Sequence, residues 1–423
     1  MRKFKEVEFG MIPEDWDVKK IIDLKSAEKS AIAMGPFGSN IKAENFVAVG
    51  VPVIRGTNFN FDKYIGGEFV FLNDAKADEL RGSNCREGDL VFTHRGTIGQ
   101  VAIIPKGKFS RYVISQSGMK LTVDCEKVNN EFLFYFFKSK AGQYQLLKNE
   151  AQVGVPSISN PLTTLKELEV PLPPLFEQLQ IVSILNSLDD KIDLLQRQNK
   201  ILEQLAETLF RQWFVEKAEE RWGTLKVKDV CTIISKGTTP TTLGKTFTDS
   251  GINFIKAESL TDDGGFLIEK FSHIDEETDE ILKRSRISFQ DILITIAGTI
   301  GRIAYVTQDI LPANTNQAIA FMRVKKDLIH PYFIYCLFNT KEIRKDFEGR
   351  VVHAVQPNLS LGEIGDIEFR MPSPKILKVG MERILTLFEK KEMNINQIKS
   401  LIQLRDTILP KLVRGELRIQ NND

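Results

Sequence analysis

Apolar residues recur in steps of three and four along two long stretches of the chain, which is the heptad spacing of helices that pack side by side. The first series is Ile181, Leu185, Leu188, Ile192, Leu195, Asn199, Leu202, Ala206, Leu209 and Trp213. The second series is Leu377, Met381, Ile384, Phe388, Lys391, Ile395, Ile398, Ile402, Arg405, Leu409 and Leu412. We predict two long helices that pair antiparallel as a coiled coil. The alternative is two unrelated amphipathic helices, each packed on its own core.

The first helix would extend about 48 Å from Ile181 to Trp213, at about 1.5 Å per residue. A helix of that length separates two domains. Asn199 stands at a core position of the first series, where a polar side chain costs stability but can fix the register. An exposed Asn199 on a slightly rotated helix is the alternative.

Short runs rich in β-branched and aromatic residues, separated by Gly, Thr and Asn, predict strands outside these helices. In one half of the chain they are DLVFTHR (89–95), QVAIIP (100–105) and KLTV (120–123). In the other they are DILITIAG (291–298), RIAYVT (302–307) and AIAFMRV (318–324). Each half is therefore predicted to be an α/β domain.

The two halves are copies of one another. THRGTIGQVAIIP (93–105) matches TIAGTIGRIAYVT (295–307) at six of thirteen positions, and GVPVIRGTNF (50–59) matches GINFIKAESL (251–260). Further on, NNEFLFYFFKSK (129–140) matches IHPYFIYCLFNT (329–340), and VPSIS (155–159) matches QPNLS (356–360). The turns GPFGSNIK (35–42) and KGTTPTTLGK (236–245) do not match, so the repeat leaves open whether they share a backbone contact. A pseudo-two-fold repeat suits a ligand with two sites at a fixed spacing, such as duplex DNA.

The repeat divides the chain into five parts. We predict a first domain over residues 1–172, a first long helix over 173–216, a second domain over 217–373, a second long helix over 374–416 and a C-terminal tail over 417–423. The aromatic run FLFYFF (132–137) becomes FIYCLF (333–338) in the second copy. Because two aromatic residues are lost, we predict a core helix here and not a platform that stacks on bases.

Composition is that of an ordinary globular protein, with 42% apolar and 27% charged residues. The net charge of +1 argues weakly against a nucleic-acid binder that acts alone, so partner subunits would supply part of the attraction to DNA. The four cysteines show no metal-binding or disulfide spacing, and no signal peptide or membrane span is visible. These features predict a cytoplasmic protein with reduced thiols and no membrane contact.

Sequence signals of catalysis are missing. In GTTPTTLGKT (237–246), six residues separate Gly237 from Gly244, where a phosphate-binding loop needs four. No GxGxxG follows a strand, and neither an Asn-Pro-Pro-aromatic tetrapeptide nor HExxH occurs. We predict no catalytic residue, no cofactor and no metal in this chain.

Several motifs occur in an order that resembles the specificity subunit of Type I restriction-modification systems. They are GMIPEDW (10–16), GPFGS (35–39), the two Gly-Thr-Ile-Gly segments, and PLPPLFEQ (171–178) with its helix. The resemblance covers essentially the whole chain. It implies two target-recognition domains that each read half of an interrupted double-stranded DNA sequence. It also implies two modification subunits that use S-adenosylmethionine and restriction subunits that use ATP, with both cofactors on those partners.

Candidate DNA contacts are polar residues at turns that the repeat places equivalently. Arginine pairs best with guanine and Asn or Gln with adenine, whereas Lys, Ser and Thr mostly hold phosphate. The candidates in the first domain are Arg55, Asn58, His94, Arg95, Thr97 and Gln116. Those in the second are Lys256, Ser259, Thr299, Arg302, Asn316 and Gln317. A solvated loop residue or turn cap is the alternative for each, and a shared structural hydrogen bond is favoured for Gln116 and Gln317.

Two other functions stay open from the residues alone. One is an enzyme, a methyltransferase or nuclease with diverged motifs. The other is a structural adaptor that binds protein partners through its paired domains.

Overall fold

The chain forms two units, each of which contains one α/β domain and part of both long helices. The computed structural model describes residues 3–36, 40–59, 63–151, 154–352 and 358–417. The first unit is Met1–Leu194 with Gln397–Asp423, and the second is Leu195–Asn396. The loop residues Phe37, Gly38 and Ser39, the pair Gln356 and Pro357, and tail residues 418–423 lie outside the described residues.

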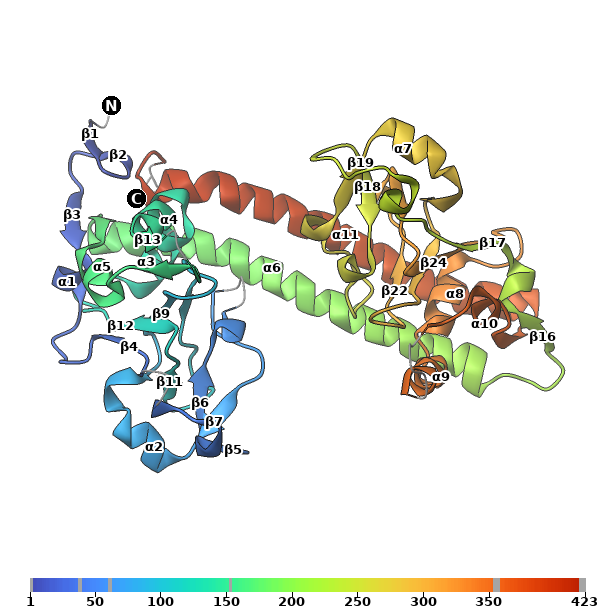
Figure 1. The fold of residues 1–423 in the computed structure, drawn as a ribbon, viewed down its shortest axis with the longest axis horizontal. Helices are drawn as coiled ribbons and strands as arrows, with labels where there is room; N and C mark the ends of the chain where they lie inside the picture. The colour runs from blue at the N-terminus through green and yellow to red at the C-terminus, as the bar shows by residue number, and fades with distance from the viewer. Residues whose placement is uncertain (1–2, 37–39, 60–62, 152–153, 353–357, 418–423) are drawn as a thin grey trace. The chain divides into compact units, whose positions relative to one another are not determined.

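The first domain contains two main sheets (Figure 1). A four-stranded antiparallel sheet has the order β10 (Val101–Ile103), β9 (Leu90–Thr93), β12 (Gly118–Leu121) and β4 (Ile32–Met34). A mixed sheet has the order β5 (Phe46–Val47), β7 (Val70–Leu72), β6 (Val51–Ile54), β11 (Tyr112–Ile114) and β8 (Asn84–Cys85). β6 and β11 are parallel, and the other pairs are antiparallel.

The second domain repeats this arrangement strand for strand, apart from β5. Its antiparallel sheet has the order β17 (Cys231–Lys236), β24 (Ile319–Val324), β21 (Ile292–Thr295) and β22 (Ile303–Tyr305). Its mixed sheet has the order β19 (Ser272–Ile274), β18 (Ile252–Ile255), β23 (Ala313–Thr315) and β20 (Arg286–Ile287). The registers also agree, because Thr93 pairs with Gly118 in one copy and Thr295 with Ile319 in the other. The predicted strands and the repeat are confirmed.

Shorter elements complete each domain. In the first unit they are β1 (Phe4–Val7), β2 (Gly10–Pro13), β3 (Asp17–Lys20), α1 (Ile21–Leu24), α2 (Asp74–Glu79), α3 (Asn130–Lys138), α4 (Lys140–Leu147), β13 (Glu150–Ala151), β14 (Ser157–Ile158), α5 (Pro161–Glu167) and β15 (Glu169–Leu172). In the second they are β16 (Gly223–Lys226), α7 (Glu276–Ile281), α8 (Pro331–Phe338), α9 (Lys341–Val352), α10 (Leu361–Gly365) and β25 (Glu368–Met371).

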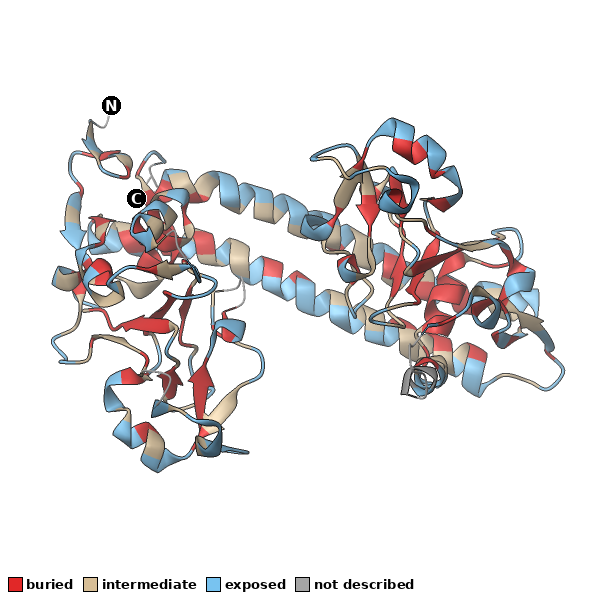
Figure 2. Cartoon of the chain, in the orientation of Figure 1, coloured by how far each residue is buried: buried red, intermediate tan, exposed pale blue. Residues whose placement is uncertain are grey.

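The aromatic helices α3 and α8 lie in the two cores. Every residue from Phe132 to Phe137 is buried, and every residue of α8 is buried as well. Asn129 caps α3 by accepting a hydrogen bond from the Phe132 amide at 3.0 Å, so the helix begins where the aromatic run begins. The prediction of a core helix is confirmed. Figure 2 shows the buried residues concentrated in the strands and inner helices of each unit.

The long helices are α6 (Leu175–Phe210), which continues as a π-helical turn at Arg211–Glu216, and α11 (Pro374–Val413). In the first unit the early residues Ile181 and Leu185 share a core with the late residues Leu409 and Leu412. In the second unit the late residue Phe210 shares a core with the early residue Ile384. The helices therefore pair antiparallel, as predicted.

A buried asparagine pair lies on the helix seam within the second unit. The side chain of Asn394 is fully buried, and its Nδ2 donates to Asn199 Oδ1 and to Gln198 Oε1, both at 2.9 Å. Asn199 is half-buried, and its side chain contacts the partner helix. A polar pair at one seam position favours a single register of the two helices.

The motifs that begin the first domain and the first long helix contact each other. Trp16 is fully buried, and its Nε1 donates to Glu177 Oε2 at 3.0 Å. The neighbouring Gln178 is also fully buried, and its Oε1 accepts from the Asn129 amide at 2.8 Å. These contacts fix the start of α6 against the domain and against the start of α3.

Candidate DNA interface

The Gly-Thr-Ile-Gly segments are tight turns that join β9 to β10 and β21 to β22. Gly96 and Gly99 have positive φ angles of 81° and 79°, and the second copy repeats both conformations. Left-handed backbone favours glycine at these positions. The hydroxyl of Thr93 donates to the Thr97 carbonyl within the turn and accepts from the Gln100 amide at 3.0 Å. Thr295 makes the equivalent bonds in the second copy, so both turns are rigid.

Two further segments join this turn in each domain. His94 N donates to the Ser117 carbonyl at 2.9 Å, and the His94 carbonyl accepts from Ile158 N at 2.9 Å. In the second domain Ile296 N donates to the Ala318 carbonyl at 2.8 Å, and the Ile296 carbonyl accepts from Leu359 N at 3.0 Å. Three separate segments therefore present their exposed residues side by side, on the same backbone frame in both domains.

A fourth segment follows β6 or β18. Ser115 N donates to the Ile54 carbonyl at 2.9 Å, which joins the short helical turn Gly56–Asn58 to the group. Asn58 is fully buried, and its Nδ2 donates to the carbonyls of Gly66 at 2.9 Å and Glu68 at 2.8 Å. In the second domain Ser259 is fully buried and donates to the Lys270 carbonyl at 3.2 Å. Asn58 and Ser259 thus hold the backbone of their loops and offer no side chain to a ligand.

His94 also has a structural role. Its side chain is 6% exposed, and its Nε2 lies 3.0 Å from the Gln116 carbonyl, which can only accept a hydrogen bond. Burial lowers the pKa of His94 below its usual value, against the opposing effect of the Gln116 carbonyl. The neutral imidazole therefore donates through Nε2 and fixes the turn that carries Gln116.

The other candidates divide into exposed and engaged residues. The exposed ones are Arg55, Arg95, Thr97, Gln116, Thr299 and Gln317. Lys256 is half-buried, with its ammonium 4.5 Å from the Phe247 ring centroid, and half-buried Asn316 accepts from the Ala318 amide at 3.2 Å. Gln317 also bonds through Oε1 to the Thr239 hydroxyl. Arg302 is engaged by Asp262 and the Leu260 carbonyl, as described below.

The two domains share a backbone contact that the sequence repeat left open. The turns 35–42 and 236–245 differ in sequence, yet both begin with the same close backbone approach. A Cβ atom on Gly35 would lie 1.8 Å from the Ser115 carbonyl oxygen, and one on Gly237 would lie 1.9 Å from that of Thr315. Only glycine fits at either position, and the shared contact involves the turn that carries Gln116 or Gln317. The sequence comparison did not reveal this contact, because Gly35 is the first residue of its segment and Gly237 is the second residue of its own.

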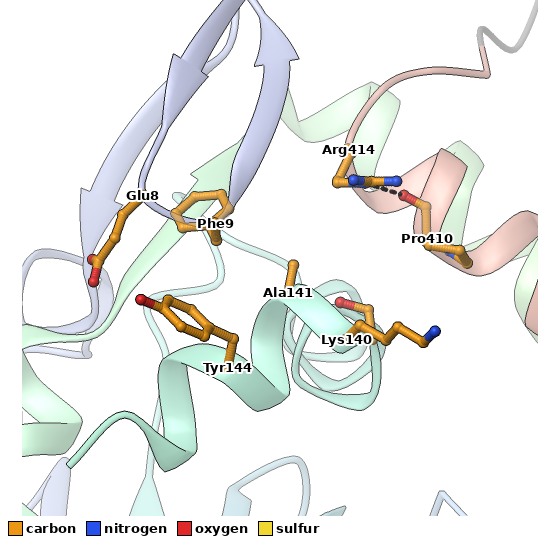
Figure 3. Close-up of a pocket in the computed structure, with 8 residues that line it drawn as sticks. Glu8, Phe9, Lys140, Ala141, Tyr144, Pro410 and Arg414 are labelled. Atoms are coloured by element: carbon orange, nitrogen blue, oxygen red, sulfur yellow. Dashed lines mark hydrogen bonds between the residues drawn. The ribbon is translucent and has the colours of Figure 1, made fainter.

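The cavity of the first unit is separate from the candidate DNA interface. A cavity of about 320 Å³ in the first unit is lined by residues of the N-terminal hairpin, α4 and the end of α11, and none of the candidate DNA contacts lines it (Figure 3). Among the described residues, no group of three or more His, Cys, Asp or Glu side chains could hold a metal ion. Within the same residues, no helix has the length and apolar character needed to cross a bilayer.

Comparison with known proteins identifies the family. The family described as the Type I restriction modification DNA specificity domain matches residues 13–204 and again residues 219–404. The chain belongs to this family. Each match takes in one recognition domain and most of one long helix, so the chain is a Type I DNA specificity subunit with two recognition domains.

Relatives agree with this assignment along nearly the whole chain. The MjaIX specificity subunit of Methanocaldococcus jannaschii is 28% identical, with 99% of this chain and 97% of the relative covered. The HindI specificity subunit of Haemophilus influenzae is 21% identical, with 85% and 93% covered. The crystal structure of the S subunit from M. genitalium has the same fold, with a TM-score of 0.53 at 18% identity over 94% of this chain and 96% of that one.

Sequence reasoning missed the threonines that support the recognition turns of this specificity subunit. Thr93 and Thr295 are identical in the repeat, and each closes its turn through two hydrogen bonds. Their identity in both copies of the repeat was the available signal. Both threonines therefore belong to the shared scaffold of the turn.

Proposed function

We propose that each recognition domain reads one half of an interrupted duplex DNA target, and that the chain itself catalyses no reaction. The observation that carries this proposal is the repeated backbone frame with different exposed side chains. Arg95 is exposed where the second copy has Ala297, and buried His94 is replaced by buried Ile296. Such a frame holds two readers in the same geometry and leaves their base preferences separate.

Eight of the candidate residues are proposed as the DNA contacts. They are Arg55, Arg95, Thr97, Gln116, Lys256, Thr299, Asn316 and Gln317. Arginine and glutamine can form paired hydrogen bonds with base edges, and lysine and threonine suit phosphate. The remaining four, Asn58, His94, Ser259 and Arg302, are proposed to position these residues.

Two modification subunits are proposed to dock on the outer faces of α6 and α11, with restriction subunits joining that complex. S-adenosylmethionine and ATP would bind to those partners. Exposed apolar residues on the long helices, including Leu194, Ile201 and Leu205 of α6 and Met393 of α11, support a protein partner on these faces. We place the complex in the cytoplasm, with its DNA.

Sequencing of the methylated adenines in a host that carries the chain with its partner subunits tests this function. Arg95→Ala should relax or abolish recognition of one half-site, at a cost of about 1 to 3 kcal/mol in binding, and should leave the other half-site unchanged. Arg81→Ala is the matched control, because Arg81 is an exposed arginine of the same domain at the end of α2. A change in both half-sites would contradict separate readers.

The alternative functions give different results. Methyl transfer by the purified chain with S-adenosylmethionine alone would show an enzyme. An adaptor of protein partners would show no salt-dependent affinity for duplex DNA, since that dependence comes from ion release at phosphates.

A further inference from the structure

The residue after the Gly-Thr-Ile-Gly turn makes the same tertiary hydrogen bond in both domains, although its identity differs. In the first domain Gln100 Nε2 donates to the Phe59 carbonyl at 3.4 Å. In the second domain Arg302 Nη1 donates to the Leu260 carbonyl at 2.9 Å. Gln100 and Arg302 correspond in the repeat, and so do Phe59 and Leu260. The shared bond joins the recognition turn to the segment after β6 or β18.

Arg302 also makes a second contact, to a carboxylate. Its Nε donates to Asp262 Oδ1 at 2.6 Å, and its side chain is only 24% exposed whereas that of Asp262 is 81% exposed. One guanidinium thus donates both to the Leu260 carbonyl and to the carboxylate of Asp262, two residues further along the chain. Arginine suits this double contact because its donors have a fixed planar arrangement.

The segment that Arg302 holds is a compact turn over residues 260–266. Leu260 and Phe266 form a β-bridge, and Thr261 N donates to the Gly265 carbonyl at 3.1 Å. The Thr261 hydroxyl accepts from Gly265 N at 2.8 Å. Gly264 has a φ of 80°, and a Cβ atom there would lie 2.4 Å from the Tyr335 hydroxyl. The turn is therefore fixed on one side by α8 and on the other by Arg302.

We propose that Arg302 is a positioning residue for recognition of the second half-site, which acts by fastening the 260–266 turn to the Gly298–Gly301 turn. The inference rests on the proposed DNA-reading function and deepens it. Two of the five N–H donors of the guanidinium are bonded to the protein and its side chain is only 24% exposed, so fewer donors remain for guanine recognition. The base preference of the second domain then depends on Arg302 only through the turns that it joins.

Arg302→Gln tests this role, because it restores the residue that the first domain uses for the same bond. Hydrogen exchange of the 261–266 amides in the full chain, measured without DNA, should rise about tenfold in Arg302→Ala and distinctly less in Arg302→Gln. Asp262→Asn should raise it less than Arg302→Ala, since it weakens one of the two contacts. Unchanged exchange in Arg302→Ala would overturn the proposal.

A DNA readout separates positioning from base reading. In the complete complex with its partner subunits, Arg302→Gln should keep the methylated sequence of the second half-site, and Arg302→Ala should lower target affinity about fivefold. A changed base preference in Arg302→Gln would overturn the proposal, whatever the exchange result. Absence of sequence-specific methylation by the unmodified complex would instead refute the proposed function, and the exchange measurement would still stand.

Discussion

The two recognition domains share a scaffold but are attached to the long helices by different chemistry. In the first unit a network of hydrogen bonds and charges joins the domain, α6 and α11, in addition to the apolar core that they share. The single proton of the Tyr135 hydroxyl is shared between two acceptors, Asn186 Oδ1 at 2.8 Å and Asp189 Oδ2 at 2.7 Å. Asp189 Oδ1 accepts from Arg405 at 3.0 Å. On the domain side, Glu131 accepts from Asn186 at 2.7 Å and pairs with Lys63 at 2.8 Å.

In the second unit the attachment is a stack of aromatic rings. Tyr332 of α8 lies between Tyr305 of β22 and Phe388 of α11, at centroid distances of 3.9 and 4.0 Å. The rings are nearly parallel, with interplanar angles of 3° and 8°. One polar contact accompanies the stack, from the Tyr332 hydroxyl to Glu392 at 3.2 Å. Burial raises the pKa of Tyr332 far above its usual value, so the hydroxyl stays protonated and donates.

One of the positions that differ between the copies takes part in both attachments. Glu131 and Tyr332 each stand two residues after the N-cap of their helix, which is Asn129 or His330. Aromatic contacts depend on burial and dispersion and change little with pH. Ionic contacts are directional and depend on charge, and removal of one partner leaves the others unsatisfied. One substitution within a repeat can therefore change how firmly, and under which conditions, each domain is held.

The largest expected effect comes from breaking the aromatic stack. Tyr332→Ala should destabilise the second unit by about 3 to 5 kcal/mol, as for other buried aromatic residues cut to alanine. Tyr332→Phe keeps the ring and removes only the Glu392 contact, so it should cost about 0.5 to 1.5 kcal/mol. Denaturant-dependent hydrogen exchange, resolved by segment, measures both units in one experiment. Equal costs for the two variants would show that the hydroxyl and not the stack holds the domain.

A smaller effect is expected in the first unit. Glu131→Ala removes the carboxylate that pairs with Lys63 and accepts from Asn186 Nδ2, so it should cost about 1 to 3 kcal/mol. Glu131→Gln keeps the shape and an acceptor for Asn186, so it should cost less. Glu87→Ala, at an exposed carboxylate of the same domain, should change stability little. A cost for Glu131→Ala no larger than that of Glu87→Ala would mean that the network does not fasten the domain.

The same network predicts a pH dependence that the second unit should not share. Burial alone would raise the pKa of Glu131, but hydrogen bonds from Lys63 and Asn186 outweigh it, and the pKa lies below the ordinary value of 4.5. A carboxyl whose folded pKa is lowered contributes its full stability above the ordinary pKa and loses it as pH falls through the folded value. Below about pH 4.5, amide hydrogen exchange in α3 should therefore become faster relative to amide hydrogen exchange in α8. Glu131→Gln should remove this difference, and its persistence in that variant would assign it to another group.

Much of the fold was visible in the sequence because burial and periodicity are local signals. The seam from Ile181 to Trp213 and the six matched strands follow directly from spacing. The heptad spacing placed Asn199 on the seam, but it did not place its hydrogen-bond partner Asn394 there. Asn394 stands one position before Ile395 of the second series, and spacing cannot show a helix rotation of that size.

The candidate interface could be predicted only in part. The repeat identified the turns that the backbone brings together, but it could not separate buried from exposed polar residues. By residue type Asn58 resembles a base reader and Ser259 a phosphate contact, but tertiary hydrogen bonds hold both side chains in the interior. The role of Arg302 depends on a carbonyl forty-two residues away, which no local pattern reveals. Which exposed residues touch bases stays a prediction.

The smallest effect on stability is expected from an insertion in the long helices that leaves both attachments intact. Such an insertion should change the DNA target that is modified. We predict that one extra heptad after Gln198 in α6 and after Asn394 in α11 keeps both seams in phase. This placement preserves the bond between Asn199 and Asn394 in the second unit. It also leaves the Tyr135 network and the Tyr332 stack intact. Seven residues add about 10.5 Å of helix, or at most about 3 base pairs at about 3.4 Å per pair.

Sequencing of methylated adenines should then return the same bases in each half-site and an unread gap that is longer by about one to three pairs, with the lower value if the helix pair crosses the DNA obliquely. A heptad added to α6 alone is the control, and it should abolish modification because the two seams no longer match in length. If the double insertion modified DNA at the original gap, the helix pair would not set the spacing. If it changed the bases that are read, the attachments in the two units would not hold the domains independently of helix length.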